Sequence, residues 1–304
     1  GYGGNVAGST WKRATGPVAG EHYAVHSPKL IDYFKKKQVQ VIRLLFSWER
    51  VQSALWGPVP AAGAGYAEYF ANFKRVVDYA TSLGIVVIIE PWQANASGGA
   101  GGARWRGHLV GSSKVDLLAF ADLWSKLATI FKANARVEYG LVNEAHNMST
   151  MTWWTTAQKC IDAIRAAGAT TRIYVPGNGY TSAGEWTHSG YDTARTKRSN
   201  AYGWLNANGT GKALFDPLGK TVAEVHVYLD PGGVGNSTEI VSTTIARERI
   251  AVALDEAAAH GYTIFLGEIG LYAGNPIAAR AWADFIAYAK AKASVLTGYT
   301  WWAA

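Results

Sequence analysis

The chain has 304 residues, 49% of them apolar and 17% charged, and carries a formal charge of +7. This composition is typical of a globular protein with a sizeable core, and excludes a disordered, coiled-coil or collagen-like chain. No apolar run approaches the ~18 residues of a membrane span, and Lys and Arg are scattered, so we expect neither a membrane nor a nucleic-acid partner.

Short apolar segments alternate with amphipathic helical patterns along the whole chain. The predicted strands are Gly3–Ala7, Val39–Phe46, Ile85–Pro91, Val137–Glu144, Arg172–Gly177, Val222–Leu229, Thr263–Gly270 and Leu296–Ala303. The predicted helices are Pro28–Gln38, Tyr66–Leu83, Val115–Ala133, Thr152–Ala167, Thr243–His260 and Pro276–Ala293. Alternation of this kind implies parallel strands with right-handed crossovers, and eight strands favour a closed (β/α)8 TIM barrel, a single α/β domain over residues 1–304.

Two segments interrupt this rhythm. Ala94–Ser113 is a Gly-rich loop that contains Arg104-Trp105-Arg106, and Tyr180–Lys220 is a long stretch without a clean helical pattern. In a barrel the loops that follow strands form the face that carries the active site. The chain also has 13 Trp and 16 Tyr, several of the Trp in Gly-rich loops (among them Trp186 and Trp204), where flat rings suit stacking on sugars.

Cysteine, nucleotide and metal motifs are absent from the sequence. Cys160 is the only cysteine, which excludes an internal disulfide and a Cys-based metal site. Neither a dinucleotide-binding G-x-G-x-x-G after the first strand nor a P-loop occurs. We therefore expect no cofactor and no catalytic metal.

Polar residues gather at the carboxyl ends of the predicted strands, which meet at one face of a barrel. Glu144 and Glu268 both end strongly apolar strands, where a carboxylate is costly unless it is solvated, paired or used. Glycoside hydrolysis needs two such groups, one to protonate the leaving oxygen and one to attack the sugar or activate water. The other strand-end residues are Arg43, Trp92, Gln93, Asn143, His226, Tyr228, Trp301 and Trp302.

Five fragments, in the same chain order, resemble glycoside hydrolase family 5, the cellulase-type family of retaining barrels. Gly140–Met148 resembles its asparagine–glutamate signature, Phe265–Gly270 its nucleophile strand and Val41–Arg50 its arginine strand. His226-Val227-Tyr228 is similar to its His-x-Tyr pair, and Trp301-Trp302-Ala303-Ala304 to its closing tryptophan strand.

The resemblance implies a role for each matching residue. Glu144 would be the general acid and base, and Glu268 the nucleophile that forms a glycosyl–enzyme. Asn143 would bind the sugar 2-hydroxyl, Arg43 would keep the nucleophile ionised, Tyr228 would contact the nucleophile, and His226 the acid or the substrate. Trp301 or Trp302 would form the floor of the subsite on the non-reducing side, and strand alternation sends the two to opposite sides.

Departures from the family concern the substrate and the end of the chain. Trp92 and Gln93 stand where the family usually has His-Asn, which helps to hold the reacting sugar. The family normally continues past the eighth strand, whereas this sequence stops at Ala304, so either a tail is missing or the barrel closes differently.

The sequence thus predicts a monomeric, secreted or periplasmic retaining endo-β-glycanase that cuts β-1,4-glucan and can also transglycosylate. One alternative is the same chemistry on mannan or an acidic exopolysaccharide, which Arg104 and Arg106 could grip. A second is a non-catalytic carbohydrate-binding protein on the same scaffold, and a third, an aldolase or isomerase barrel, lacks strand-end lysines.

Overall fold

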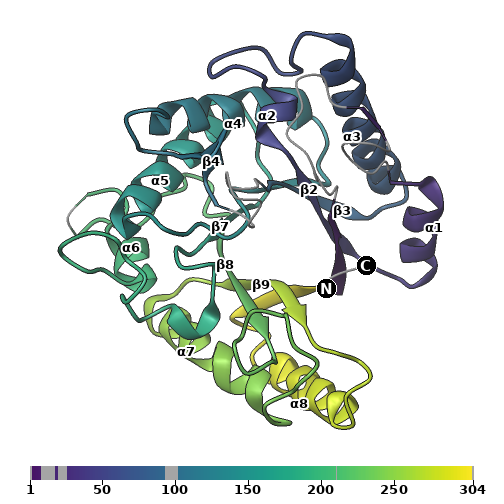
Figure 1. Ribbon diagram of the computed structural model, residues 1–304, viewed down its shortest axis with the longest axis vertical. Coiled ribbons are helices and arrows are strands. Elements are labelled where there is room, and N and C mark those ends of the chain that lie inside the picture. The colour runs from purple at the N-terminus through teal and green to yellow at the C-terminus, as the bar shows by residue number, and fades with distance from the viewer. Residues whose placement is uncertain (1, 8–17, 20–25, 93–101, 210, 303–304) are drawn as a thin grey trace.

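A computed structural model describes residues 2–7, 18–19, 26–92, 102–209 and 211–302. Within these residues eight parallel strands form a closed barrel, which confirms the predicted (β/α)8 fold (Figure 1). In order around the barrel the strands are β1 (Tyr2–Ala7), β2 (Val41–Phe46), β3 (Val86–Pro91), β6 (Val137–Gly140), β7 (Ile173–Pro176), β8 (Thr221–Tyr228), β9 (Ile264–Gly270) and β10 (Leu296–Trp301).

The barrel closes through its first and last strands. Gly3 of β1 pairs with Val41 of β2 on one side, and Gly4 pairs with Trp301 of β10 on the other. The eighth strand therefore joins the first directly, which answers how the barrel closes.

Helices surround the barrel, as Figure 1 shows. Hydroxyl or carboxylate side chains cap several helix starts, since Ser27, Asp116 and Ser149 each accept a hydrogen bond from a first-turn backbone N–H. Among the described residues no helix is both long and apolar enough to cross a membrane. The helices are α1 (Pro28–Lys36), α2 (Trp48–Val51), α3 (Ala64–Ser82), α4 (Leu117–Phe131), α5 (Thr150–Ala166), η1 (Ala183–Glu185), α6 (Asn200–Asn206), α7 (Ile245–His260) and α8 (Ala278–Ala291).

The loops on the strand-end face carry structure that the sequence patterns did not predict. The fourth barrel strand stops at Gly140, four residues before the predicted end at Glu144. A small hairpin forms from β4 (Arg104–Trp105) and β5 (His108–Leu109).

The Tyr180–Lys220 stretch is also more ordered than predicted, because it contains η1 and α6. Trp186 and Trp204, which were expected to suit ligand stacking, are buried here and contact Trp154 edge-on. Gly203 of α6 makes this packing possible, since a Cβ there would lie 2.0 Å from Cδ1 of Trp154. These tryptophans stabilise the loop and do not offer a sugar-binding face.

Candidate active site

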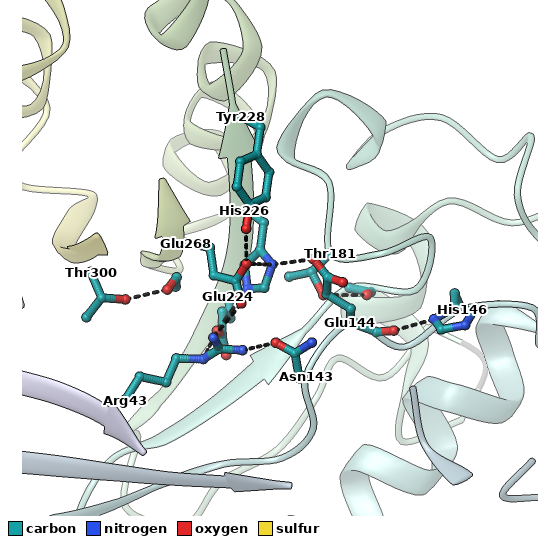
Figure 2. Close-up of polar contacts among 12 residues, drawn as sticks. Arg43, Asn143, Glu144, His146, Thr181, Glu224, His226, Tyr228, Glu268 and Thr300 are labelled. Carbon is teal, nitrogen blue, oxygen red and sulfur yellow. Dashed lines mark hydrogen bonds and ion pairs between the residues drawn. The ribbon is translucent and has the colours of Figure 1, made fainter. Parts of the chain in front are cut away.

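Arg43 lies at the floor of the site and links residues from four other strands or their ends. It is fully buried on β2, and its guanidinium donates to acceptors that converge from around the barrel (Figure 2). All three nitrogens are used, as expected for a planar fork with five N–H groups. The distances are 2.5 and 2.7 Å to Glu90, 2.7 Å to Glu268, 2.5 Å to Oδ1 of Asn143 and 3.1 Å to Glu224.

Glu268 lies on β9 with a donor on each carboxylate oxygen. Nη1 of Arg43 donates to Oε1, and the hydroxyl of Tyr228, from β8, donates to Oε2. The carboxylate is 3% exposed, so these charged and polar contacts act in a poorly solvated setting. Burial, together with the negative charge of Glu268, raises the pKa of Tyr228, which keeps the phenol a donor.

Glu144 lies in the loop after β6 with an unusual backbone conformation. Its φ of 50° is left-handed, although it is not a glycine. The loop is held from both sides, because Nδ1 of His146 lies 2.7 Å from the Glu144 carbonyl and Gly102 donates to the Asn143 carbonyl. The side chain is 16% exposed and therefore open to a ligand. This backbone turn lies four residues after the end of β6 and directs the carboxylate toward His226.

The two predicted catalytic carboxylates lie close together. Glu144, His226 and Glu268 each place one ligating atom within 4.8 Å of the other two. Retaining glycosidases hold their carboxyl groups ~5–5.5 Å apart, and inverting ones ~6.5–9.5 Å apart. The spacing therefore fits direct attack by one carboxylate, the arrangement of a retaining enzyme.

His226 bridges the two sides of the site. Its Nδ1 lies 2.9 Å from Oε1 of Glu144 and 3.5 Å from Oε2 of Glu268, and its Nε2 lies 3.3 Å from Oε1 of Glu224. Burial alone would lower the pKa of this histidine. Three carboxylates, those of Glu268, Glu144 and Glu224, outweigh burial and the opposing charge of Arg43 and raise it to about 10.

Two further carboxylates were missed as site residues. Glu90 and Glu224 are both fully buried beneath the pair and both contact Arg43. Burial raises the pKa of Glu90 to about 7, with Arg43 opposing and Glu224 adding to the effect. A signal existed for each: Glu90 ends an apolar strand, and Glu224 lies two residues before His226, on the same face of β8.

The remaining predicted site residues, the tryptophans and Gln93, differ in where the structure places them. Trp301 packs edge-on against Trp282 of α8, with ring centroids 4.9 Å apart, so it faces the outer helices and not the site. Alternation therefore turns Trp302, next along the chain and half-buried, toward the barrel mouth. Trp92 directly follows β3 and donates its backbone N–H to Phe46, while Gln93 lies outside the described residues.

A metal site has a geometric candidate only in the same group of side chains. Among the described residues, Glu144, His226 and Glu268 alone bring three possible ligand atoms together. Each of the three already faces a hydrogen-bond partner within the site, and we assign none of them to a metal. The absence of a catalytic metal remains a prediction.

Comparisons with known proteins agree with this geometry. The sequence model Cellulase (glycosyl hydrolase family 5) matches residues 4–304. Endo-β-1,4-glucanase A of Emericella nidulans is 32% identical over 305 residues, covering 99% of this chain and 82% of the relative.

Solved structures of related proteins have the same fold as this chain. The endo-β-1,4-glucanase Xac0029 of Xanthomonas axonopodis pv. citri is 29% identical, with a TM-score of 0.86 over 99% of this chain and 87% of its own. XacCel5A, solved with cellopentaose, is 30% identical, with a TM-score of 0.87 over 99% and 88%. The chain is therefore a glycoside hydrolase and belongs to glycosyl hydrolase family 5, the cellulase family.

Proposed function

We propose that this protein is a retaining endo-β-1,4-glucanase in which Glu268 is the nucleophile and Glu144 the general acid and base. The observation that carries the proposal is the spacing of the two carboxylates, within 4.8 Å oxygen to oxygen. It fits double displacement through a covalent glycosyl–enzyme.

The surrounding contacts suit each role. Arg43 and Tyr228 hold both oxygens of Glu268, which orients the carboxylate for attack on the anomeric carbon. Glu144, partly exposed, gives a proton to the leaving oxygen and then takes one from the water that cleaves the glycosyl–enzyme. Oδ1 of Asn143 accepts from Arg43, which turns its amide N–H groups outward to donate to the sugar 2-hydroxyl.

The substrate we propose is a β-1,4-glucan chain. Relatives over the full length are named endo-β-1,4-glucanases, and a structural neighbour holds cellopentaose. Trp302 follows β10 and Trp92 follows β3, with Gln93 next to Trp92 in the sequence, so both rings are available at the strand ends to stack on sugars. Arg106 donates to the Ser53 carbonyl and covers the Trp105 ring, so it is already occupied and does not favour an acidic glycan.

The cellular location of the protein and a second reaction, transglycosylation, follow from the proposed substrate. A polymer such as cellulose is met outside the cytoplasm, so we propose a secreted or periplasmic, monomeric enzyme. Sugar acceptors can compete with water for the glycosyl–enzyme, and the aromatic cleft favours transglycosylation at high oligosaccharide concentration.

The deciding experiment follows the anomeric configuration of products from cellopentaose by ¹H NMR, alongside reducing-sugar release from soluble β-1,4-glucan, mixed-linkage glucan, mannan and xylan. We expect β-anomers first and activity on the glucans. Initial α-products would exclude the retaining assignment, and release from mannan alone would move the substrate to the first alternative.

One variant, compared with the intact enzyme, separates catalysis from binding. Glu268→Gln should retain binding of cellopentaose by calorimetry while product formation stops. If intact enzyme binds cellopentaose and cleaves none of the glycans, the protein is a carbohydrate-binding scaffold and the proposal fails.

A further inference from the structure

Glu224 occupies a position that touches both halves of the site from below. Its Oε1 lies 3.1 Å from Nε of Arg43 and 3.3 Å from Nε2 of His226. Its Oε2 is buried and has no hydrogen-bond partner among the described residues. Gly267 makes the position possible, because a Cβ there would lie 1.9 Å from Oε1. A buried carboxylate with one unsatisfied oxygen is costly, which indicates a purpose beyond packing.

The position of Glu224 determines which ring nitrogens of His226 can carry a proton. Both ring nitrogens face carboxylate oxygens, Nδ1 toward Glu144 and Nε2 toward Glu224. A neutral imidazole carries one N–H and one lone pair, and that lone pair would then face a carboxylate oxygen. When both ring nitrogens carry a proton, each N–H can donate to a carboxylate oxygen, and no lone pair faces one.

We propose that Glu224 is a positioning residue that keeps both ring nitrogens of His226 protonated, so that Nδ1 always donates to Oε1 of Glu144. With Oε1 engaged as an acceptor, the transferable proton of Glu144 resides on its other oxygen, and the carboxyl group is held in one orientation through both steps. The inference rests on the proposed function of Glu144 as acid and base.

The charges around His226 support this assignment. The acidic groups that face it are Glu144, Glu224 and Glu268, and Glu90 contributes from β3 at longer range. Arg43 is the one opposing cation among the described groups that act on it. The balance raises the pKa of His226 to about 10, so the ring that faces Glu224 stays a cation across the working range.

Glu90 provides the matched control. It is buried like Glu224 and contacts Arg43 with both oxygens, but no hydrogen bond joins it to His226. Glu224→Gln and Glu90→Gln are both isosteric replacements of one buried carboxyl group that contacts Arg43. Only the first removes the acceptor that holds the second proton on His226.

The test compares kcat/KM against pH for phenyl and 2,4-dinitrophenyl β-cellobiosides, because the dinitrophenolate leaves without a proton from Glu144. For Glu224→Gln we expect kcat/KM with the phenyl substrate to fall at least tenfold at its optimum, with less than a threefold change for the dinitrophenyl substrate. The alkaline limb with the phenyl substrate should move up by about one pH unit, because a neutral His226 no longer favours ionised carboxylates beside it. Glu90→Gln should affect both substrates alike and leave the limb in place. Equal loss on both substrates in Glu224→Gln, without a shift, would overturn the proposal.

A measurement on the unaltered enzyme covers the case in which the variant does not fold. In ¹⁵N-histidine spectra the His226 signal, assigned with His226→Asn, should show both nitrogens protonated from pH 6 to 8. A neutral ring at pH 7 would contradict the proposal. If the enzyme cleaves neither cellobioside, the proposed function fails, while this spectrum still decides the state of His226.

Discussion

The two carboxylates that we propose as catalytic, Glu144 and Glu268, are held by different kinds of structure. Glu268 lies within strand β9, and its partners Arg43 and Tyr228 come from strands as well. Glu144 lies in a loop with left-handed backbone, and its neighbours Tyr180 and Thr181, from the next loop, are also left-handed. The nucleophile is thus fixed by the sheet, whereas the acid and base depends on backbone strain maintained by loop contacts.

The loop contacts that maintain this strain are specific. Tyr180 donates its N–H to the Ala145 carbonyl, and its ring stacks on His146 with centroids 4.1 Å apart. The carbonyl of Thr181 accepts from the backbone of His226, which ties this loop to β8. We therefore expect the position of Glu268 to tolerate changes in the loops, and the position of Glu144 to be sensitive to them.

Removing each carboxylate should break the site in different ways. Glu268→Gln should lower kcat/KM on the order of 10⁴-fold or more for every substrate, since no glycosyl–enzyme can form. Glu144→Gln should cost ~10²–10⁴-fold with a poor leaving group and far less with 2,4-dinitrophenolate. Stopped-flow and steady-state rates on the two cellobiosides check this. An equal loss on both substrates in Glu144→Gln would contradict the assignment.

A methyl group added on the strand side should disturb the nucleophile half. Gly267→Ala places a Cβ 1.9 Å from Oε1 of Glu224, so the buried carboxylate must move, at a cost of about 1–3 kcal/mol in unfolding free energy. Gly184→Ala is the control, because nothing lies within 4 Å of its Cβ. Urea titration of both variants measures the difference. Similar midpoints would mean that Glu224 is not wedged against Gly267.

In the loop that carries Glu144, a residue that resists left-handed backbone should be destabilising. Asn147 is exposed with a φ of 56°, a conformation that β-branched residues resist, so Asn147→Val should cost about 1–2 kcal/mol and reduce activity through the Glu144 loop. Asn147→Gly should be close to neutral. Thermal melting and rates on the phenyl cellobioside report both effects, and an unchanged Val variant would show that strain does not position this loop.

The smallest effect concerns pH and stability. His226 has a pKa raised from 6.5 to about 10, so its contribution to stability is complete below about pH 6.5 and is lost as pH rises toward 10. The melting temperature of the enzyme should therefore fall over this window more than that of Glu224→Gln. Scanning calorimetry at pH 6.5, 8 and 9.5 makes the comparison, and parallel curves would argue against the Glu224–His226 pairing.

Sequence reasoning predicted the barrel, and placed the two proposed catalytic carboxylates at one face of it, for a physical reason. The carboxyl ends of parallel strands meet at one face, so Glu144, Glu268, Arg43 and His226 had to converge once the strands were recognised. The early end of β6 escaped, because the apolar run continues through Leu141 and Val142 beyond its last residue, Gly140. The contacts of Arg43 with Glu90, Asn143 and Glu224 escaped too, since they depend on which strands lie opposite one another.

Barrel closure has a consequence for how the protein is made on the ribosome. Strand β1 hydrogen-bonds to β10, so Gly4 finds its partner Trp301 only after nearly the entire chain has been synthesised. Until then one edge of the growing sheet has unpaired backbone groups, which are a template for pairing with other chains. Chaperone protection during synthesis, and expression at low temperature in a foreign host, should therefore matter more for the yield of this enzyme than for proteins whose sheets pair locally.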